Sequence, residues 1–365
     1  MLGCALTLFS RKDPLRPQPP RITLFESDNL KVTYVPTGAV DRVVVTFASW
    51  VESPTKERPG FAEDFLIRRG ISAVHVTCGG NDWYQYPEID AAMAATARAR
   101  MSFGRCYTYG LSMGGYAAIR FARAVGAETA ITIAPQFAID PRQPPFDPRW
   151  ARDAARIRFI LGDPWVDVGA RVVVIYDNCG IDLRHIVLYR RFIRLYEIGL
   201  PYSGHNPARF LLDLGLFQDV ISGLLADRFD AVAFRRQFRE KRRTSPEYLF
   251  NLSRASRHAA RSLALIDEAL RLAPDRPHAI GTRGNILLAL GRTAEAEAAY
   301  RKGLEIAPND GWLHHALAIA LRRQGRLETA VKEAELAFHL APDEPEHRDL
   351  LARMTGSPIG GVAPT

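Results

Sequence analysis

A repeat with a period of 34 residues constrains the C-terminal third of this chain more than any other feature. The segments RLAPDRPHA, EIAPNDGWL and HLAPDEPEH recur with prolines at 274, 308 and 342. Each unit holds a helical stretch rich in small residues, a turn at Gly291 or Gly325, and a second helical stretch that ends at Ala-Pro. Because alanine and glycine let paired helices approach closely and proline ends a helix, this period predicts a stack of helix pairs.

The pattern resembles the tetratricopeptide repeat (TPR). The small, large and proline positions of that repeat are matched by Gly284, Ala296, Tyr300, Gly303 and Pro308 in one unit, and by Ala318, Ala330, Ala337 and Pro342 in the next. Residues 243–273 match only in LALIDEALRLAP, so we count them as a degenerate first repeat, and PEHRDLLARM as a capping helix. The resemblance implies a peptide or protein partner, although such a stack can also pack on a neighbouring domain or dimerise.

Upstream of the repeats, short β-branched runs alternate with helical stretches. Eight runs are candidate strands: ITLF, KVTYV, RVVVTFA, SAVHVTC, RCYTYG, TAITIAP, RVVVIYD and RLYEIGL. Helical patterns follow five of them, at about 60–69, 88–100, 113–125, 183–192 and 207–225. Runs such as RVVVTFA are apolar throughout, which is typical of strands covered on both faces. This alternation predicts an α/β domain with an eight-stranded, mostly parallel sheet.

The chain therefore divides into five expected parts. These are an N-terminal extension (1–20), the α/β domain (21–230), a basic linker (231–244), the repeats with their capping helix (245–355) and a disordered tail (356–365). The formal net charge is +8, and the linker carries much of it on Arg235, Arg236, Arg239, Lys241, Arg242 and Arg243. No aromatic platform or known module accompanies this run, so we interpret it as a solvated segment and do not expect nucleic-acid binding.

The four cysteines, Cys4, Cys78, Cys106 and Cys179, lack the paired spacing of a metal site. A chain of this size can bury its core without disulfides, which favours a reducing compartment. No run approaches the roughly 18 apolar residues of a membrane span, and the first residues lack the charge order of an export signal. We therefore expect a soluble, cytoplasmic protein, with no cofactor or metal implied.

The sequence Gly110-Leu111-Ser112-Met113-Gly114 has the pattern G-x-S-x-G, between the strand-like YTYG and the helical YAAIRFARAV. A serine lifted on such a tight turn needs neighbours without side chains, since any Cβ there would meet the adjacent strand or helix. The motif in this strand–turn–helix context resembles the nucleophile elbow of the α/β-hydrolase superfamily. That resemblance implies that Ser112 is a nucleophile and that an acid and then a histidine follow it along the chain.

The resemblance places the acid after the seventh strand and the histidine after the eighth. His205, in the loop PYSGHNPARF, occupies the position expected of the base. Two aspartates follow the seventh strand, and we favour Asp182 over Asp177, although an aspartate at the start of a helix is often an N-cap. His185 lies on the following helix, and we expect it to be structural.

The same resemblance implies an oxyanion hole. Its first donor is the backbone N–H of Met113, and Ser49, after the third strand, is our candidate for the second because the family's common His-Gly pair is absent. The loops CGGNDWYQYPE and APQFAIDPRQPPFDPRW follow the fourth and sixth strands, where a pocket would form. Asn81, Asp82, Trp83 and Tyr84 could touch substrate there or could equally anchor the loop to the core. The short insert between the sixth and seventh strands argues against a bulky lipid–water interface as substrate.

These features predict a serine hydrolase that cleaves an ester, thioester or amide of a small-molecule or acylated substrate, joined to a protein-binding repeat domain. Two alternatives remain open. The hydrolase-like domain could serve without turnover as a recognition module beside the repeats, because fold does not fix function. A sugar or peptide hydroxyl could instead replace water in the second step, which would make the protein an acyltransferase.

Overall fold

The computed structural model describes residues 19–144, 147–162 and 168–356. The predicted N-terminal extension and C-terminal tail therefore lie almost wholly outside the described residues. The chain forms two compact units, Met1–Arg235 and Arg236–Thr365, which we call the α/β unit and the repeat unit. Each unit is described by itself below.

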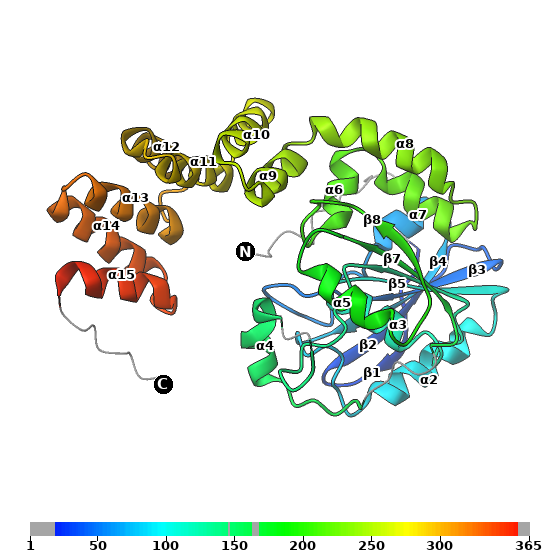
Figure 1. Ribbon diagram of the computed structural model, residues 1–365. Coiled ribbons are helices and arrows are strands. Elements are labelled where there is room, and N and C mark those ends of the chain that lie inside the picture. The colour runs from blue at the N-terminus through cyan, green and yellow to red at the C-terminus, as the bar shows by residue number, and fades with distance from the viewer. Residues whose placement is uncertain (1–18, 145–146, 163–167, 357–365) are drawn as a thin grey trace. The chain divides into compact units, whose positions relative to one another are not determined.

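The described part of the α/β unit contains an eight-stranded sheet of order β1-β2-β4-β3-β5-β6-β7-β8 (Figure 1). The strands are β1 Ile22–Glu26, β2 Leu30–Val35, β3 Arg42–Phe47, β4 Ser72–Cys78, β5 Arg105–Leu111, β6 Thr129–Ile133, β7 Arg171–Tyr176 and β8 Leu195–Gly199. β1 and β2 run antiparallel to their neighbours, and all other pairings are parallel. The prediction of an eight-stranded, mostly parallel sheet is confirmed.

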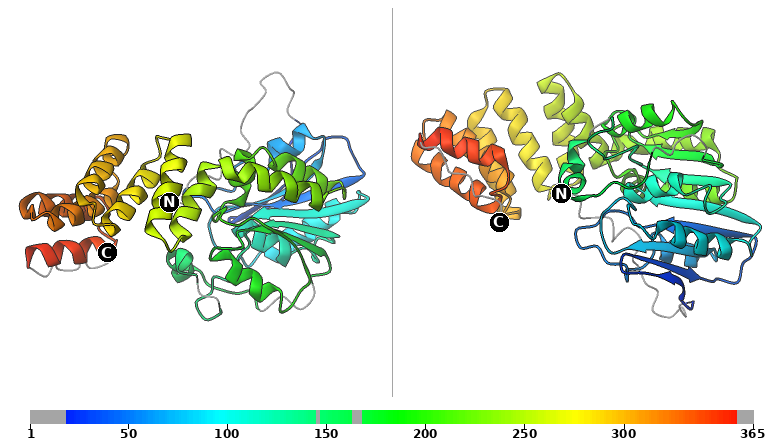
Figure 2. Two further views of the ribbon diagram at one scale, coloured as in Figure 1. Left: turned by 45° about the horizontal axis from the view of Figure 1, so that its top comes forward. Right: turned by 90° about the horizontal axis from the view of Figure 1, so that it is seen from below.

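Helices cover both faces of this sheet, as Figure 2 shows. They are α1 Glu63–Arg68, α2 Ile89–Arg100, α3 Met113–Arg120, α4 Ala151–Arg156, α5 Asp182–Tyr189, α6 Pro207–Asp213 and α7 Phe217–Leu225. On one face, α2, α3 and α5 pack with β3 side chains Val43 and Val45 in the main core. On the other face, Phe65 of α1 contacts Phe217 of α7, with ring centroids 6.1 Å apart. Burial on both faces explains why the central strands are apolar throughout.

Parallel pairing from β3 to β8 brings the carboxyl ends of these strands to one edge of the sheet. Ser112 follows β5 at this edge, the segment from Ala134 follows β6, and Asp177 follows β7. The loop with His205 follows β8. Residues separated by about 90 positions in the chain therefore meet at this edge.

Residues 231–244, expected as a solvated basic linker, are mostly helical. α8 spans Ala231–Lys241, and a short 3-10 turn follows at Arg242–Thr244. The division between the two units falls inside α8. Phe234 and Phe238 are four residues apart, so they lie on one face of the helix, and both are buried. The many charged residues around them made this apolar face hard to recognise in the sequence.

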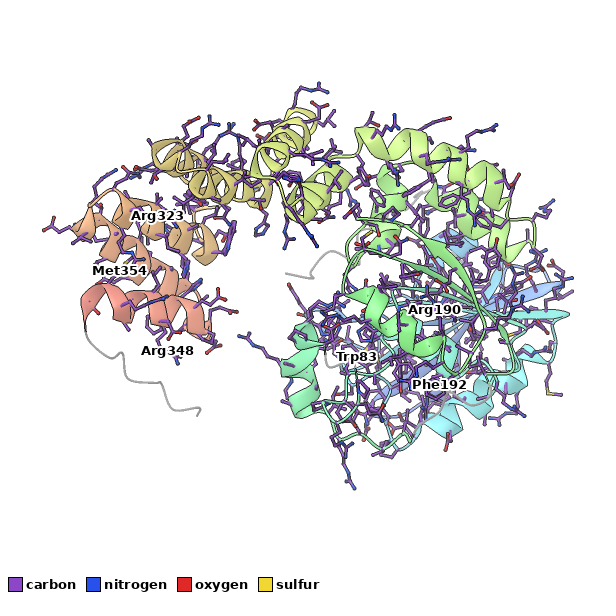
Figure 3. All side chains as sticks on the ribbon, in the orientation of Figure 1. Trp83, Arg190, Phe192, Arg323, Arg348 and Met354 are labelled. Atoms are coloured by element: carbon purple, nitrogen blue, oxygen red, sulfur yellow. The ribbon has the colours of Figure 1, made fainter. Side chains whose placement is uncertain are left out.

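The repeat unit is built from consecutive helices: α9 Pro246–Ala255, α10 Ala259–Leu272, α11 Pro277–Ala289, α12 Thr293–Ile306, α13 Gly311–Arg323, α14 Leu327–Leu340 and α15 Pro345–Thr355. Gly291 and Gly325 both have φ +76°, the left-handed conformation that closes each helix pair. A Cβ on Gly284 would lie 2.4 Å from the ring of Tyr300, so only glycine permits this approach. Arg323 links α13 to α11 by donating to the carbonyl of Leu288 at 3.1 Å (Figure 3).

Among the residues that the structure describes, no helix combines the length and the apolar character needed to cross a bilayer.

Candidate active site

Ser112 lies on a strained turn between β5 and α3. Its backbone has φ +53° and ψ −118°, a conformation that non-glycine residues rarely adopt and that is common at functional sites. The turn is tight because a Cβ on Gly110 would lie 2.1 Å from the carbonyl oxygen of Gly114. A Cβ on Gly114 would lie 2.4 Å from the carbonyl oxygen of Phe47 in β3. The two glycines of G-x-S-x-G therefore permit the turn that presents Ser112 at the sheet edge.

Ser112, His205 and Asp182 form a continuous hydrogen-bonded chain. The Ser112 Oγ lies 3.1 Å from Nε2 of His205, and Nδ1 of His205 lies 2.9 and 3.0 Å from the two carboxylate oxygens of Asp182. The Asp182 carboxylate accepts the Nδ1 proton, which leaves Nε2 free to accept the proton of Ser112. The serine hydroxyl is thereby paired with a base that an acid orients.

Asp182 is 2% exposed. Burial by itself would raise the pKa of this carboxyl, but the charge and hydrogen bond of His205, with those of Arg149, outweigh burial and lower the pKa below its usual value. Asp182 is the first residue of α5, and the N-cap position is occupied by Ile181. The carboxylate is bound by His205 and Arg149.

Asp177, the alternative acid, binds backbone groups. Its Oδ1 accepts from the N–H groups of Cys179 at 2.8 Å and Tyr202 at 3.0 Å, and its Oδ2 accepts from that of Gly204 at 2.9 Å. Burial raises the pKa of Asp177, although these three hydrogen bonds act in the opposite direction. The structure thus brings Asp182 to His205, while Asp177 holds the loop on which His205 lies.

Of the two candidate oxyanion-hole residues, Met113 directly follows Ser112 and Ser49 lines a cleft at Ser112. Met113 is the first residue of α3, and the first N–H groups of a helix lack intrahelical acceptors. Ser49 lines the cleft together with Trp50, Leu111, Ser112, Trp150, His205 and Asn206. The empty volume of this cleft is about 330 Å³, part of it open to solvent. Two indoles, Trp50 and Trp150, therefore stand beside the serine and the histidine.

Three further residues at the site were not singled out from the sequence. Gln136 is fully buried and donates from Nε2 to the Ser112 Oγ at 3.2 Å and to the carbonyl of Ala134 at 3.1 Å. Trp150 packs edge-on against the ring of His205, with centroids 5.6 Å apart. Arg149 donates to Asp182 at 2.6 Å. All three lie in the segment after β6, whose position at the carboxyl edge was the available signal.

The loop after β4 anchors the edge of the site. Tyr84 donates its hydroxyl to the carbonyl of Ala48 at 2.9 Å, and Asn81 donates to that of Val51 at 2.7 Å. Asp82 accepts from the hydroxyl of Tyr86 at 2.9 Å. These contacts agree with the interpretation that Asn81, Asp82 and Tyr84 anchor the loop rather than touch substrate.

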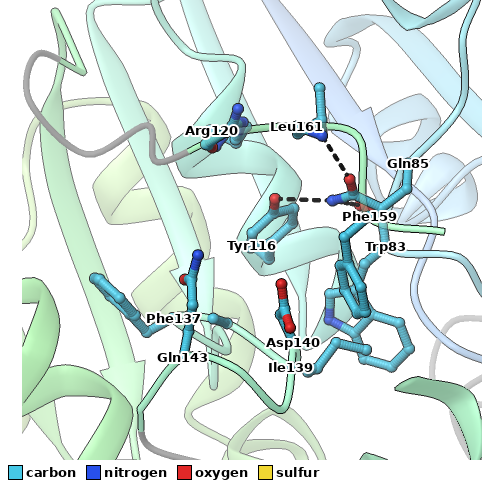
Figure 4. Close-up of a pocket in the computed structure, with 12 residues that line it drawn as sticks. Trp83, Gln85, Tyr116, Arg120, Phe137, Ile139, Asp140, Gln143, Phe159 and Leu161 are labelled. Atoms are coloured by element: carbon cyan, nitrogen blue, oxygen red, sulfur yellow. Dashed lines mark hydrogen bonds between the residues drawn. The ribbon is translucent and has the colours of Figure 1, made fainter. Parts of the chain in front are cut away.

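Trp83 contacts Trp150, with ring centroids 5.1 Å apart. It also borders a second pocket, of about 360 Å³, in which Gln85 contacts the hydroxyl of Tyr116 at 3.4 Å (Figure 4). Ser112, Asp182 and His205 are not among the residues that line this pocket, so we do not assign it a role in the candidate triad.

His185 is fully buried and separate from the Ser112 chain. Its Nδ1 accepts from the backbone N–H of Phe137 at 3.0 Å, so the ring proton lies on Nε2, which is 3.1 Å from Asp147. Within the described ranges, no group of three or more His, Cys, Asp or Glu side chains could hold a metal ion.

Comparison with known proteins gives matches to the repeat unit. Residues 287–354 match the family model described as tetratricopeptide repeat. Together with the helix pairs and the 34-residue period, this match identifies a TPR domain in the C-terminal region. The search of curated proteins found no match to this chain.

Several solved structures are similar to part of the chain. The first TPR domain of Spaghetti (RPAP3), bound to an HSP90 peptide, is 17% identical over 27% of this chain and 78% of its own, with a TM-score of 0.26. MamA from Desulfovibrio magneticus RS-1 is 20% identical over 41% and 81%, with a TM-score of 0.31. The Sgt2 TPR domain from Aspergillus fumigatus is 16% identical over 30% and 77%, with a TM-score of 0.29.

Proposed function

We propose that the α/β unit is a serine hydrolase of the α/β-hydrolase superfamily, which cleaves an acyl bond through an acyl-enzyme. The chain of contacts from Ser112 through His205 to Asp182 is the observation that carries this proposal. The strained backbone of Ser112 supports it, because such strain persists where function requires it.

In the proposed mechanism, Ser112 Oγ attacks the carbonyl carbon while its proton passes to Nε2 of His205. Asp182 stabilises the imidazolium that forms. The N–H of Met113, with a second donor near Ser49, would bind the negative charge that develops on the carbonyl oxygen. His205 then protonates the leaving alcohol, thiol or amine, and water attacks the acyl-enzyme by the same route to release the acid and free Ser112.

The cleft supports a short acyl group as substrate. Trp150 is 1% exposed and is held between His205 and Trp83, so its indole is a fixed wall beside Ser112. Trp50 faces it, with ring centroids 6.2 Å apart. A long acyl chain would have to displace one of these indoles, whereas an acetyl or propionyl group would not.

A panel of p-nitrophenyl esters of increasing chain length tests this function. We expect the highest kcat/KM on the shortest acyl groups, and loss of about three orders of magnitude or more in Ser112→Ala and His205→Ala. Turnover that is equal in all three proteins would exclude the proposed triad. Absence of turnover on the whole panel would favour a recognition module, and transfer to an added alcohol in preference to water would favour an acyltransferase.

For the repeat unit we propose a peptide or protein partner, which the TPR family match supports. Cys78 and Cys106 are buried free thiols. Free thiols support a reducing, cytoplasmic location for the protein.

A further inference from the structure

The Asp182 carboxylate is shared between two hydrogen-bond donors. Its Oδ1 lies 2.9 Å from Nδ1 of His205 and 2.6 Å from Nη2 of Arg149. Arg149 belongs to the 3-10 turn Pro148–Trp150, between β6 and β7. The side chain of Asp182 is 3% exposed, so both contacts lie where solvent screening is weak.

Arg149 is itself held by a second carboxylate. Its Nε lies 3.0 Å from both carboxylate oxygens of Asp147, and its Nη2 is 2.6 Å from Oδ2 of Asp147. Asp147 also contacts Nε2 of His185, whose other ring nitrogen accepts from a backbone N–H, so that ring is neutral. The guanidinium is therefore fixed in one orientation between two carboxylates.

We infer that Arg149 is a positioning residue of the proposed triad, which fixes the Asp182 carboxylate and offsets part of the negative charge that faces His205. This inference rests on the proposed hydrolase function, because it assigns Arg149 an effect on the base of that reaction.

The charges around the site give the physical reason. Asp147 and Asp182 carry two negative charges, Arg149 carries one positive charge, and His185 is neutral, which leaves one negative charge to stabilise an imidazolium at His205. Without Arg149 the offset of the Asp182 charge would be lost, and the imidazole would hold its proton to higher pH than in the wild type. The third nearby carboxyl, Asp177, is held by backbone N–H groups of its own loop.

The same turn also fixes the imidazole sterically. Trp150 follows Arg149 directly and packs against the His205 ring. One turn of chain therefore orients both the acid and the base. A purely structural arginine would affect the amount of folded enzyme or its overall rate, but not the pH at which His205 loses its proton.

The test is the pH profile of kcat/KM on a short-chain ester for the wild type, Arg149→Met and Arg149→Lys. We expect Arg149→Met to move the acidic limb upward by about one pH unit, which makes kcat/KM about tenfold lower on the acidic side. Arg149→Lys keeps the charge, so its limb should stay close to that of the wild type. Arg156→Met is the matched control, since Arg156 is an exposed arginine that pairs with Asp153 on the neighbouring α4.

A titration of the histidine NMR signals provides a readout without turnover. The signal of His205, assigned by its loss in His205→Gln, should titrate about one pH unit higher in Arg149→Met than in the wild type. An unchanged midpoint would overturn the role of Arg149, whatever the loss of rate. Absence of Ser112-dependent turnover in the wild type would instead refute the hydrolase function, while the NMR midpoint would still decide the effect of Arg149 on His205.

Discussion

The hydroxyl of Ser112 contacts the side chains of His205 and Gln136. The Ser112 Oγ accepts a hydrogen bond from Nε2 of Gln136 at 3.2 Å and lies 3.1 Å from Nε2 of His205. The carbonyl of Ala134 accepts from the same amide nitrogen and sets the orientation of the amide group. In the proposed mechanism, a donor fixed on this oxygen would stabilise negative charge there during attack and again when Ser112 leaves the acyl-enzyme.

Replacement of Gln136 by alanine should therefore lower kcat/KM about tenfold, which corresponds to the roughly 1.5 kcal/mol of one hydrogen bond to a charged group. Steady-state kinetics on a short-chain ester measures this effect. Gln143→Ala is a suitable control because Gln143 lines the second pocket and not the cleft at Ser112. Equal rates for Gln136→Ala and the wild type would show that Gln136 only fills space.

At the scale of elements, the junction of β5 and α3 depends on close approach to β3. The second residue of α3 is Gly114, and a Cβ there would collide with the backbone carbonyl of Phe47, which cannot move as a side chain can. Packing of this helix on the sheet and presentation of Ser112 therefore have the same steric requirement.

Gly114→Ala should destabilise the protein by about 1–3 kcal/mol, the usual cost of overpacking, and should abolish Ser112-dependent turnover. Urea unfolding followed by tryptophan fluorescence measures the first effect. Gly79→Ala is the control, since a Cβ there would make only an ordinary contact at 3.8 Å. A fully stable and active Gly114→Ala variant would contradict the proposed geometry of the turn.

Strands and helices with a clear apolar pattern could be predicted from the sequence. The ends of other helices depend on tertiary contacts that the sequence pattern does not show. The run RVVVTFA predicted β3 because a strand buried on both faces is apolar throughout. The helix expected at 207–225 is instead two helices, α6 and α7, separated where Gly215 adopts φ +64°. The helix expected at 113–125 ends earlier, since α3 stops at Arg120. A turn inside a helical pattern does not change the spacing of the apolar residues. The sequence pattern therefore does not show where these helices end.

The candidate site likewise contains residues that could be predicted from the sequence and residues that could not. The resemblance of G-x-S-x-G to the nucleophile elbow implied the order of Ser112, Asp182 and His205 along the chain. Gln136 and Arg149 could not be predicted, because the segment after β6 has neither period nor motif, and its path depends on tertiary contacts such as that between Arg149 and Asp182.

At the scale of the whole molecule, the chain combines two kinds of construction. The α/β unit joins distant segments at one sheet edge, where Ser112, Asp182 and His205 meet. The repeat unit is built from local helix pairs, each in contact with its neighbours, and this construction produces an extended surface. The TPR match identifies the second part, while the function of the first rests on the chemistry of Ser112.

That chemistry can be measured most directly with a fluorophosphonate probe, which forms a covalent bond only with an activated serine. The full-length wild-type protein should be labelled at Ser112, as located by mass spectrometry of the labelled peptide. Ser112→Ala should not be labelled, and His205→Ala should react far more slowly because its serine has lost the base. Equal labelling of the wild type and Ser112→Ala would contradict the assignment of Ser112 as nucleophile.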